Sequence, residues 1–231
     1  MTSAALSVRL VIEPKGDPRG LHIDVSFDVP PGVTVLFGPS GAGKSRTLAS
    51  IAGLLRPHQG RVALGDEVWF DAERRIELPI HRRRVAYVFQ SLALFPHMSA
   101  AENVAYGLPR DVPRDERRAR ALEMLTKMHV EKLADRMPRT FSGGEAQRVA
   151  LARAFAMTPR AVLLDEPFSA LDAELKAELL REVGEQLARD RVPTVLVTHQ
   201  PAEAELLGER VVFIEKGRVS RTTSMSDAPF R

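Results

Sequence analysis

The stretch from Gly38 to Ser45 constrains the fold more than any other part of the chain. It fits the pattern G-x-x-x-x-G-K-[ST] and follows the apolar run Val33 to Phe37. A buried strand that leads through a glycine-rich turn into a helix points successive N–H groups at phosphate oxygens. The helix N-terminus adds a dipole that favours negative charge. The stretch therefore predicts a phosphate-binding loop made of Gly38, Pro39, Ser40, Gly41, Ala42, Gly43, Lys44 and Ser45.

Two side chains of this loop carry the chemistry that a nucleotide needs. Lys44 is expected to reach the β- and γ-phosphates, and the Ser45 hydroxyl is expected to coordinate Mg²⁺. The alternative is an ordinary strand-to-helix turn with a solvated lysine. A chance match in a chain of this length arises on the order of once in a hundred sequences, so phosphate binding is favoured.

Composition limits the class of protein. The 231 residues are 44% hydrophobic and 27% charged, which is ordinary for a globular chain. Zero cysteines exclude disulfides, thiolate catalysis and thiolate zinc sites. The sequence has neither an apolar run near the roughly 18 residues of a membrane span nor an N-terminal signal segment. We therefore expect the chain to stay in the cytoplasm.

Hydrophobic periodicity divides the chain into regions. Ser7 to Ile12 and Leu21 to Val29 alternate apolar and polar residues, which is typical of antiparallel strands with one wet face. Gly60 to Phe70 returns to strand character, and these segments together predict a small antiparallel β subdomain. From Leu92 to about Met157 the pattern is helical, which predicts an inserted helical subdomain. The segment from Thr222 is polar and is expected to be a loose tail.

Four short apolar runs each end in a group suited to phosphate chemistry. In an open parallel sheet, ligands bind beyond the carboxyl ends of the strands, so groups at those ends converge in one crevice. The runs lead, in chain order, to Lys44, Gln90, Asp165 with Glu166, and His199. Their convergence predicts one site for all of these groups.

Each group has a role that its chemistry allows. Mg²⁺ prefers hard oxygen ligands and keeps several waters, so Ser45, Gln90 and Asp165 are the candidate metal ligands. Glu166 is expected to accept a proton from an attacking water. His199 is expected to hydrogen-bond the γ-phosphate or to orient that water, although a histidine at a strand end, taken alone, is more often structural. The candidate catalytic residues are Glu166, His199 and Gln90.

With these motifs in this order, residues 21–218 resemble the ATP-binding subunit of ABC transporters. The resemblance matches Gly38 to Ser45 with the Walker A loop, Gln90 with the Q-loop, Phe141 to Glu145 with the signature, Ala161 to Glu166 with Walker B, Ser169 to Asp172 with the D-loop, and His199 with the switch histidine. The signature followed by Gln147 to Ala154 is highly specific for this family.

The resemblance implies an α/β fold, namely a P-loop NTPase (RecA-like) parallel-sheet core with an antiparallel β subdomain and an inserted helical subdomain. It implies a single ABC ATPase domain over residues 1–231. Within it, residues 1–90 and 158–220 form the ATP-binding core with the β subdomain, 91–157 form the helical subdomain with the signature, and 221–231 form a tail.

Family membership further implies a head-to-tail dimer that encloses two ATP molecules. Each site pairs the Walker residues of one copy with Ser142, Gly143 and Gly144 of the other, and Asp172 joins the candidate nucleotide-binding residues. The signature turn opens a helix and so offers N–H groups to a γ-phosphate. Because the same copy already has a phosphate loop, a second anion site needs a second copy.

Several segments are similar to bacterial importers within the family, namely 87–90, 94–98 and 102–104, and segment 68–84 is most like the molybdate-type ATPases. The resemblance implies ATP-driven import of molybdate, another oxyanion or another small solute, with a solute-binding protein as an indirect partner. Ser91 to Ser99 are expected to receive a helix of an integral membrane permease, with core packing as the alternative for Leu94 and Phe95. The chain is then peripheral, at the cytoplasmic face of the inner (plasma) membrane.

Several positions depart from the family pattern. Arg46 stands where a serine or threonine usually touches the α-phosphate, so that contact becomes ionic or is lost. Glu145 replaces the usual signature glutamine, and Gln200 replaces an aspartate that often follows the switch histidine. No aromatic residue lies between Ile12 and Gly20, where the family often stacks adenine, so weak base selectivity is expected. A regulatory domain that many importer ATPases carry after the cassette is either lacking or removed.

The alternative interpretation is a soluble non-transport ABC ATPase that acts on nucleic acid or ribosomes. Members that act in translation carry two cassettes in one chain, and members that act on chromosomes hold a long coiled coil before the signature. This chain has one cassette and no coiled coil between Gly38 and Ser142. Its net charge is only +3 and no aromatic stacking pattern accompanies its basic runs, so no nucleic-acid partner is expected.

Overall fold

The computed structural model describes residues 4–14, 20–109 and 111–230. Within these residues, the strands are β1 (Leu6–Ile12), β2 (Ile23–Val29), β3 (Gly32–Phe37), β4 (Gln59–Leu64), β5 (Glu67–Asp71), β6 (Ile76–Glu77), β7 (Val85–Val88), β8 (Ala161–Asp165), β9 (Pro193–Val197), β10 (Arg210–Glu215) and β11 (Arg218–Ser224). The α-helices are α1 (Lys44–Ala52), α2 (Ile80–Arg83), α3 (Ala100–Ala105), α4 (Arg114–Lys127), α5 (Gly143–Ala156), α6 (Ala173–Asp190) and α7 (Pro201–Leu207), with short 3₁₀ turns at Glu131–Leu133, Pro138–Thr140 and Met225–Asp227.

The described strands form one sheet with two differently built halves. Its order is β6-β5-β4-β1-β2-β11-β10-β3-β9-β8-β7. Neighbours from β6 to β2 are antiparallel, whereas β10, β3, β9, β8 and β7 run parallel. The halves meet where Arg218 of β11 pairs with Asp24 of β2, and the Asp24 N–H donates to the Gly217 carbonyl oxygen at 2.7 Å. The antiparallel strands therefore continue the core sheet.

The two halves follow the patterns of their sequences. β1 and β2 pair from Leu6 with Val29 to Ile12 with Ile23, and apolar side chains face inward while alternate polar ones are mostly exposed. This period of two is what a sheet with one wet face requires. Every residue of β8 and β9 is buried, as expected for parallel strands covered on both faces.

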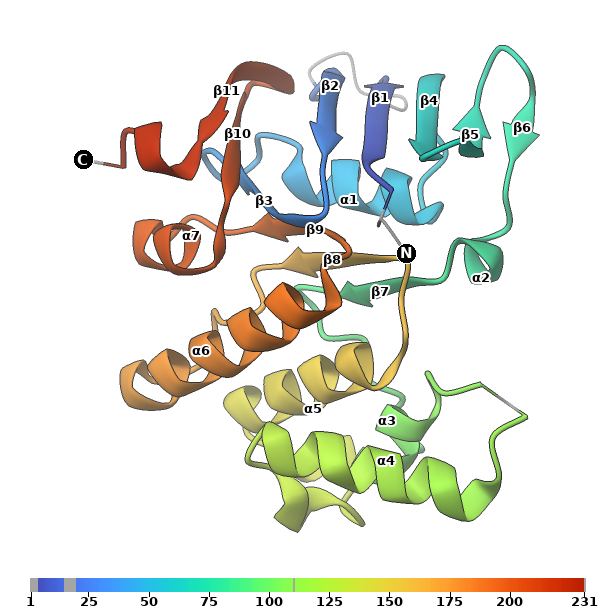
Figure 1. Ribbon diagram of the computed structural model, residues 1–231, viewed down its shortest axis with the longest axis vertical. Coiled ribbons are helices and arrows are strands. Elements are labelled where there is room, and N and C mark those ends of the chain that lie inside the picture. Colours follow the sequence, from blue (N-terminus) through green and yellow to red (C-terminus); the bar gives the residue numbers. More distant parts are fainter. Residues whose placement is uncertain (1–3, 15–19, 110, 231) are drawn as a thin grey trace.

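Helix α1 lies between the two halves of the sheet (Figure 1). Its Leu48 and Ile51 side chains are fully buried. They share one hydrophobic core with Leu10 of β1 and Leu163 of β8. Burial of a side chain of this size contributes about 1.5–3 kcal/mol. The helix that follows the glycine-rich loop is therefore held from both sides.

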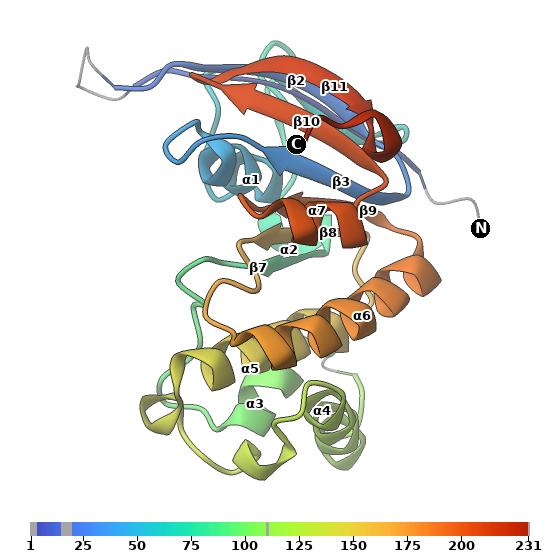
Figure 2. The same ribbon diagram turned by 90° about the vertical axis from the view of Figure 1, so that its left-hand side faces the viewer.

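Helices α3, α4 and α5 lie at the end of the molecule opposite the antiparallel strands, and α6 runs between them and the sheet (Figure 2). Leu125 of α4, Val149 of α5 and Leu179 of α6 are fully buried in a second hydrophobic core. No helix in the described ranges is both long and apolar enough to cross a membrane.

The C-terminal segment corrects the prediction of a loose tail. Residues up to Ser224 belong to β11, which pairs with β10. The Phe230 ring packs edge-on against Phe37 with centroids 4.8 Å apart, and it lies 6.0 Å from the Phe213 ring. The polar composition hid this packing, because only a few apolar residues of the segment, namely Met225, Ala228 and Phe230, pack against the core.

Candidate active site

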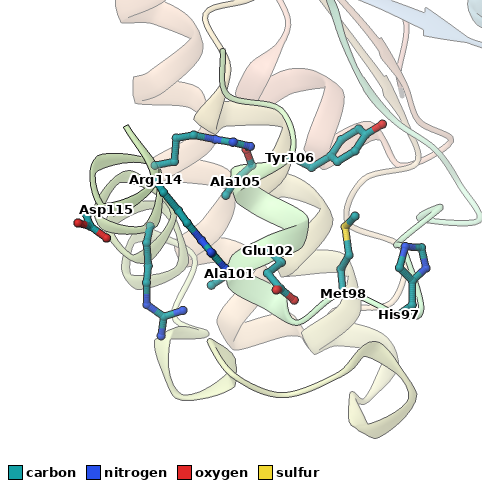
Figure 3. A pocket seen from close by; sticks show the side chains of 10 residues that line it. His97, Met98, Ala101, Glu102, Ala105, Tyr106, Arg114 and Asp115 are labelled. Carbon is teal, nitrogen blue, oxygen red and sulfur yellow. The ribbon is translucent and has the colours of Figure 1, made fainter. Parts of the chain in front are cut away.

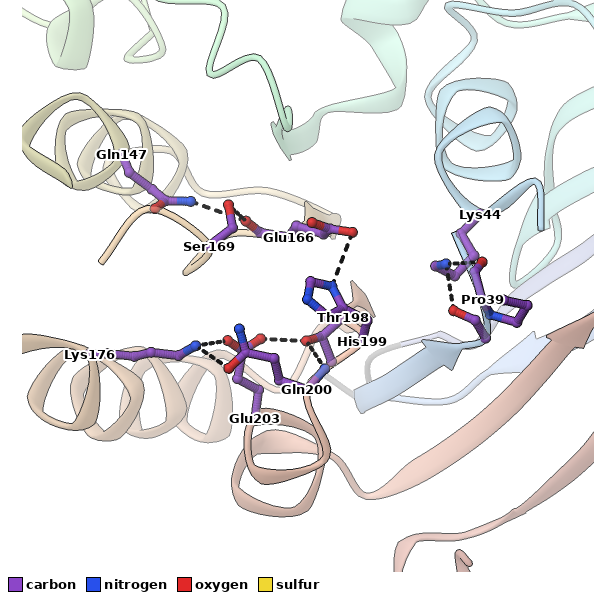
Figure 4. A network of polar contacts seen from close by, with 11 residues as sticks. Pro39, Lys44, Gln147, Glu166, Ser169, Lys176, Thr198, His199, Gln200 and Glu203 are labelled. Atoms are coloured by element: carbon purple, nitrogen blue, oxygen red, sulfur yellow. Dashed lines mark hydrogen bonds and ion pairs between the residues drawn. The ribbon is translucent and has the colours of Figure 1, made fainter. Parts of the chain in front are cut away.

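The carboxyl ends of the parallel strands gather the groups that the sequence predicts together. β3, β9, β8 and β7 are neighbours in that order, and Asp165 at the end of β8 is level with Val197 of β9. Gln90, Glu166 and His199 follow β7, β8 and β9 closely, at the edge where β3 leads into the glycine-rich loop. Figure 4 shows the Glu166 and His199 side chains together at the centre of this region.

Glycine is required at both ends of the loop. A Cβ on Gly38 would lie 2.0 Å from the Ile214 carbonyl oxygen. Gly43 has a φ of 101°, and a Cβ there would lie 2.8 Å from the Ile23 side chain. Among the described residues, no side chain caps α1, which begins at Lys44. Within that part of the chain, the N–H groups at the start of α1 therefore lack the side-chain acceptor that a cap would supply.

Lys44 is folded back on its own loop. The residue is 6% exposed, and its Nζ atom donates to the carbonyl oxygens of Gly38 and Pro39, both at 2.8 Å. Burial lowers the pKa of Lys44, and the nearby Glu166 and Asp165 carboxylates oppose this shift. The loop therefore holds a buried cation whose charge is stabilised by carbonyl dipoles and by two acids across the site.

Asp165 carries a buried carboxyl group beside Ser45. The residue is 4% exposed, and its Oδ1 atom has no hydrogen-bond partner in the described part of the chain. Burial raises the pKa of Asp165, and a hydrogen bond with the Ser45 side chain opposes the rise. A buried carboxylate oxygen without a partner is costly unless a cation satisfies it. Together with a serine hydroxyl, this oxygen fits a magnesium ion. The Gln90 side chain, after β7, is exposed.

Glu166 and His199 face each other. Glu166 Oε1 lies 3.4 Å from His199 Nδ1, and the histidine side chain is 57% exposed against 22% for the glutamate. Glu166 has a φ of 49°, in the left-handed region, and its N–H donates to the Val197 carbonyl oxygen at 3.0 Å. A sheltered carboxylate beside a solvent-facing imidazole is suited to accept a proton from water.

The signature turn is closed by its own side chains. The Ser142 hydroxyl accepts from the Glu145 N–H at 3.2 Å, and a Glu145 carboxylate oxygen accepts from the Ser142 N–H at 2.7 Å. This reciprocal arrangement is a capping box, in which glutamate and glutamine both serve at this position. The hydrogen bond from the Ser142 N–H lowers the pKa of Glu145. Gly143 and Gly144 occupy the first two helical positions.

The structure does not bring the signature turn to the phosphate loop within one chain. α1 lies between the sheet halves, whereas α5 lies among the helices (Figure 2). Asp172, at the D-loop, caps α6 by accepting from the Leu175 N–H at 3.1 Å. Arg46 extends to the segment before β2, where it donates to the Leu21 carbonyl oxygen at 3.2 Å. The predicted adenine segment includes residues 15–19, which lie outside the described residues.

An arginine of α5 fixes the turn after Gln90. Leu92 and Ala93 have φ values of 62° and 46°. Arg153 donates to the carbonyl oxygens of both residues at 2.8 Å and lies over the Phe95 ring, 5.7 Å from its centroid. Burial lowers the pKa of Arg153.

Two pockets of about 480 Å³ flank Tyr106. The first is lined by charged residues such as Glu102 and Arg114 and lies between α3 and α4, away from the strand ends (Figure 3). The second is an apolar groove beside the Gln90 turn, and its rim exposes Leu54 by 50%, Ile80 by 49% and Tyr106 by 54%.

Sequence reasoning missed the polar network behind His199. Lys176 of α6 pairs with Glu203 of α7 and donates to the Gln200 side-chain oxygen at 2.6 Å. The Thr198 hydroxyl donates to Glu203 at 2.5 Å (Figure 4). Glu203 is 3% exposed. The network fixes Thr198 and Gln200, the residues before and after His199 in the sequence. One signal in the sequence was the position of Glu203, about one helical turn after His199.

The family model described as ABC transporter matches residues 23–169. The chain is 46% identical to the molybdenum import ATP-binding protein ModC of Rhizobium meliloti, over 96% of this chain and 63% of that protein. It is 44% identical to the sulfate/thiosulfate import ATP-binding protein CysA 1 of Agrobacterium fabrum, over 88% of this chain and 59% of that protein. The chain thus spans less than two thirds of the length of these curated relatives.

A solved dimeric structure of a bacterial ABC transporter cassette matches with a TM-score of 0.84 and 29% identity, over 96% of this chain and 98% of that chain. A second structure with the same values is a post-hydrolysis state of an ATP-binding cassette bound to ADP and Pi. These likenesses confirm the predicted α/β P-loop fold. The curated relatives confirm the predicted resemblance to molybdate-type ATP-binding subunits.

Proposed function

Because the chain belongs to the ABC transporter family, we propose that it binds and hydrolyses ATP to power import of a small solute through a separate membrane permease. The observation that carries this proposal is the gathering of the phosphate loop, Asp165, Glu166 and His199 at one edge of the parallel strands. An anion loop, a buried metal-ligand oxygen and a base at one edge support transfer of a phosphoryl group to water.

ATP binds with its phosphates in the loop Gly38 to Ser45. Lys44 exchanges the two loop carbonyl oxygens for β- and γ-phosphate oxygens, which are charged and therefore stronger acceptors. Arg46 donates to the Leu21 carbonyl oxygen in the single chain, and it would give the α-phosphate an ionic contact only by leaving that partner. When bound, Mg²⁺ neutralises phosphate charge, and Ser45, Gln90 and Asp165 are the residues that would hold it.

Hydrolysis uses the groups that follow β7, β8 and β9. Glu166 accepts a proton from a water whose oxygen bonds to the γ-phosphorus, while the bond to the bridging oxygen breaks and ADP leaves. His199 hydrogen-bonds the γ-phosphate through its exposed imidazole and keeps the water aligned. Gln90 contacts the same water from the neighbouring strand end. Proton transfer to a positioned base contributes about 10² to 10⁴ in rate.

Two copies associate head to tail around two ATP molecules. Ser142, Gly143 and Gly144 of one copy donate to the γ-phosphate that the other copy holds, and Asp172 lies at the same interface. The solved dimeric cassette with a TM-score of 0.84 supports the association of two copies. The uncapped start of α1 and the exposed signature turn supply the two halves of each site.

The apolar groove beside Ser91 to Ser99 receives a helix of the permease. Its rim exposes large apolar side chains that a single chain leaves in water, and exposed apolar patches of this kind mark protein interaction sites. Seated there, the chain lies at the cytoplasmic face of the inner (plasma) membrane. ATP-driven closure of the dimer moves the permease, and hydrolysis with product release reopens it.

Molybdate or another oxyanion is the proposed cargo, delivered by a solute-binding protein. Relatives named for molybdenum import and for sulfate/thiosulfate import, at 46% and 44% identity, support this choice. The permease and the solute-binding protein select the cargo, and this chain contacts nucleotide, its second copy and the permease.

The decisive experiment traps the closed dimer on its membrane partner. A tagged Glu166→Gln variant is incubated with ATP in solubilised membranes of its source cell, and copurifying proteins are identified by mass spectrometry. Lys44→Ala, which is expected to bind ATP poorly, is the matched control. Recovery of an integral membrane permease with the first variant but not the second supports the proposal. Recovery of ribosomes or nucleic acid in its place would favour the non-transport alternative.

A further inference from the structure

We propose that Gln147 positions Glu166 and thereby couples the signature turn to hydrolysis within one chain. Gln147 lies on α5, a little more than one turn after Ser142, and only 2% of the residue is exposed. This inference rests on the proposed function, because it assigns to a residue outside the nucleotide site the control of the base inside it. Gln147 is a positioning residue, since it contacts the backbone around the base.

The Gln147 side chain uses both ends of its amide. Its Nε2 atom donates to the Glu166 carbonyl oxygen at 3.1 Å (Figure 4). Its Oε1 atom accepts from the Ala170 N–H at 2.8 Å. A backbone carbonyl can only accept and a backbone N–H can only donate, so these two partners fix the orientation of the amide. Glutamine is the neutral side chain of this length whose end carries both a donor and an acceptor, so it suits these two partners.

The bond from Gln147 supports an unfavourable backbone conformation at the base. Glu166 has a φ of 49°, a region that the Cβ atom disfavours. Its carbonyl oxygen also accepts from the Ser169 N–H at 3.3 Å and from the Ser169 hydroxyl at 3.1 Å. The donors together stabilise the conformation in which the carboxylate lies 3.4 Å from His199 Nδ1. Without Gln147, the donors to this carbonyl oxygen among the described residues are the N–H and the hydroxyl of Ser169.

The same side chain links the base to the signature turn. Gln147 and Ser142 belong to one hydrogen-bonded helix start, so they move as a unit. The turn also packs on the D-loop, because a Cβ on Gly144 would lie 3.2 Å from the Ala170 carbonyl oxygen. Engagement of Ser142 by a phosphate on the other copy therefore shifts Gln147, and Gln147 carries the shift to the Glu166 backbone.

The first test replaces the amide with an apolar side chain of the same length. Gln147→Met is expected to lower kcat by about 10- to 100-fold, because small misplacements of catalytic groups have effects of this size. KM and the affinity of the chain for ATP should stay unchanged, since the phosphate loop is untouched. Gln186→Met is the matched control, because Gln186 bonds to Asp190 on the exposed side of α6. It should leave kcat unchanged.

The second test uses a group that regains the donor when protonated. In Gln147→Glu the ionised carboxylate accepts from the Ala170 N–H but cannot donate to Glu166, whereas the protonated form can do both. Burial favours the protonated form. The rate of this variant relative to the unchanged chain should therefore rise as the pH falls. A merely structural role for Gln147 gives a lower melting temperature without this pH dependence.

The two proposals fail in different ways. An unchanged chain that neither binds nor hydrolyses ATP with Mg²⁺ would contradict the proposed function. If the unchanged chain hydrolyses ATP and Gln147→Met keeps its kcat, the inference about Gln147 alone is overturned. Should Gln147→Met unfold at the assay temperature, the Gln147→Glu profile decides: a rate ratio that does not change with pH overturns the inference.

Discussion

The phosphate loop and the signature turn both open a helix with glycine, yet they are completed differently. In the described residues, α1 begins at Lys44 without a side-chain cap, and the loop brings its own cation. α5 begins behind a reciprocal cap formed by Ser142 and Glu145, and this turn brings a carboxylate. The start of α1 is therefore open to an external anion, whereas the start of α5 already bonds to the Glu145 carboxylate.

If the proposed function holds, this difference gives one chain one complete anion site. A phosphate in the loop meets a cation and uncapped N–H groups, which together attract it strongly. A phosphate at the signature turn meets two glycine N–H groups, but the Glu145 charge offsets part of the helix dipole. The signature turn is therefore expected to bind only a phosphate whose charge Lys44 and Mg²⁺ of another copy already neutralise.

The largest expected effect comes from a variant that binds ATP and dimerises, so that the two turns meet, but that does not hydrolyse the ATP. Glu166→Gln should lower ATP hydrolysis by about 10² to 10⁴, because the amide cannot accept the proton. With ATP and Mg²⁺ retained, the variant should elute as a dimer in gel filtration. Turnover near that of the unchanged chain would remove Glu166 from the role of base.

The next largest effect comes from a change in the phosphate loop alone. Lys44→Ala should weaken ATP binding by about 2 to 5 kcal/mol, the range expected when one partner of a buried charged contact is removed. Titration calorimetry measures this loss. Lys127→Ala is the control, since Lys127 pairs with Glu123 on the exposed face of α4. Equal affinity in the two variants would contradict the assignment of the loop.

A smaller effect breaks the signature turn alone. Ser142→Ala removes the cap of α5 and should destabilise the fold by about 0.5 to 2 kcal/mol in denaturant titrations. Binding of ATP by the single chain should persist, while ATP-dependent dimerisation is lost. Ser99→Ala removes the same kind of capping box from α3. If Ser99→Ala abolishes dimerisation equally, the loss reports helix stability and not contact with phosphate.

The smallest effect concerns the carboxylate of the signature turn. The pKa of Glu145 is lowered from 4.5 by the Ser142 N–H. A lowered folded-state pKa means that the stabilisation is present above about pH 4.5 and is lost as the pH falls through the lowered value. Glu145→Gln cannot titrate, so its stability should fall less than that of the unchanged chain over this range. Parallel denaturant titrations would show identical losses if the carboxylate were not bonded in solution.

The sequence predicts the parts of the site that are local in the chain. The loop at Gly38 to Ser45 and the groups after β7, β8 and β9 could be found because strand, turn and helix start are contiguous. The cap between Ser142 and Glu145 is local in the same way, because Ser-x-x-Glu indicates a capping box.

The contacts that hold the site could not be predicted in this way. Gln147 reaches a carbonyl 19 residues away, and Lys176 reaches Gln200 across 24 residues. Such partners are set by the packing of α5 and α6 against the sheet, which no local pattern encodes. The anchoring of Phe230 on Phe37 likewise depends on the order of β3 and β10 in the sheet.

The turn after Gln90 stores conformational energy. Leu92 and Ala93 are consecutive left-handed residues with side chains, and each such residue costs roughly 1–2 kcal/mol. Arg153, which also lines the apolar groove, retains them through its two hydrogen bonds. A helix seated in the groove that drew Arg153 away would break both hydrogen bonds and let the turn relax, so the released strain would offset part of the cost of breaking them.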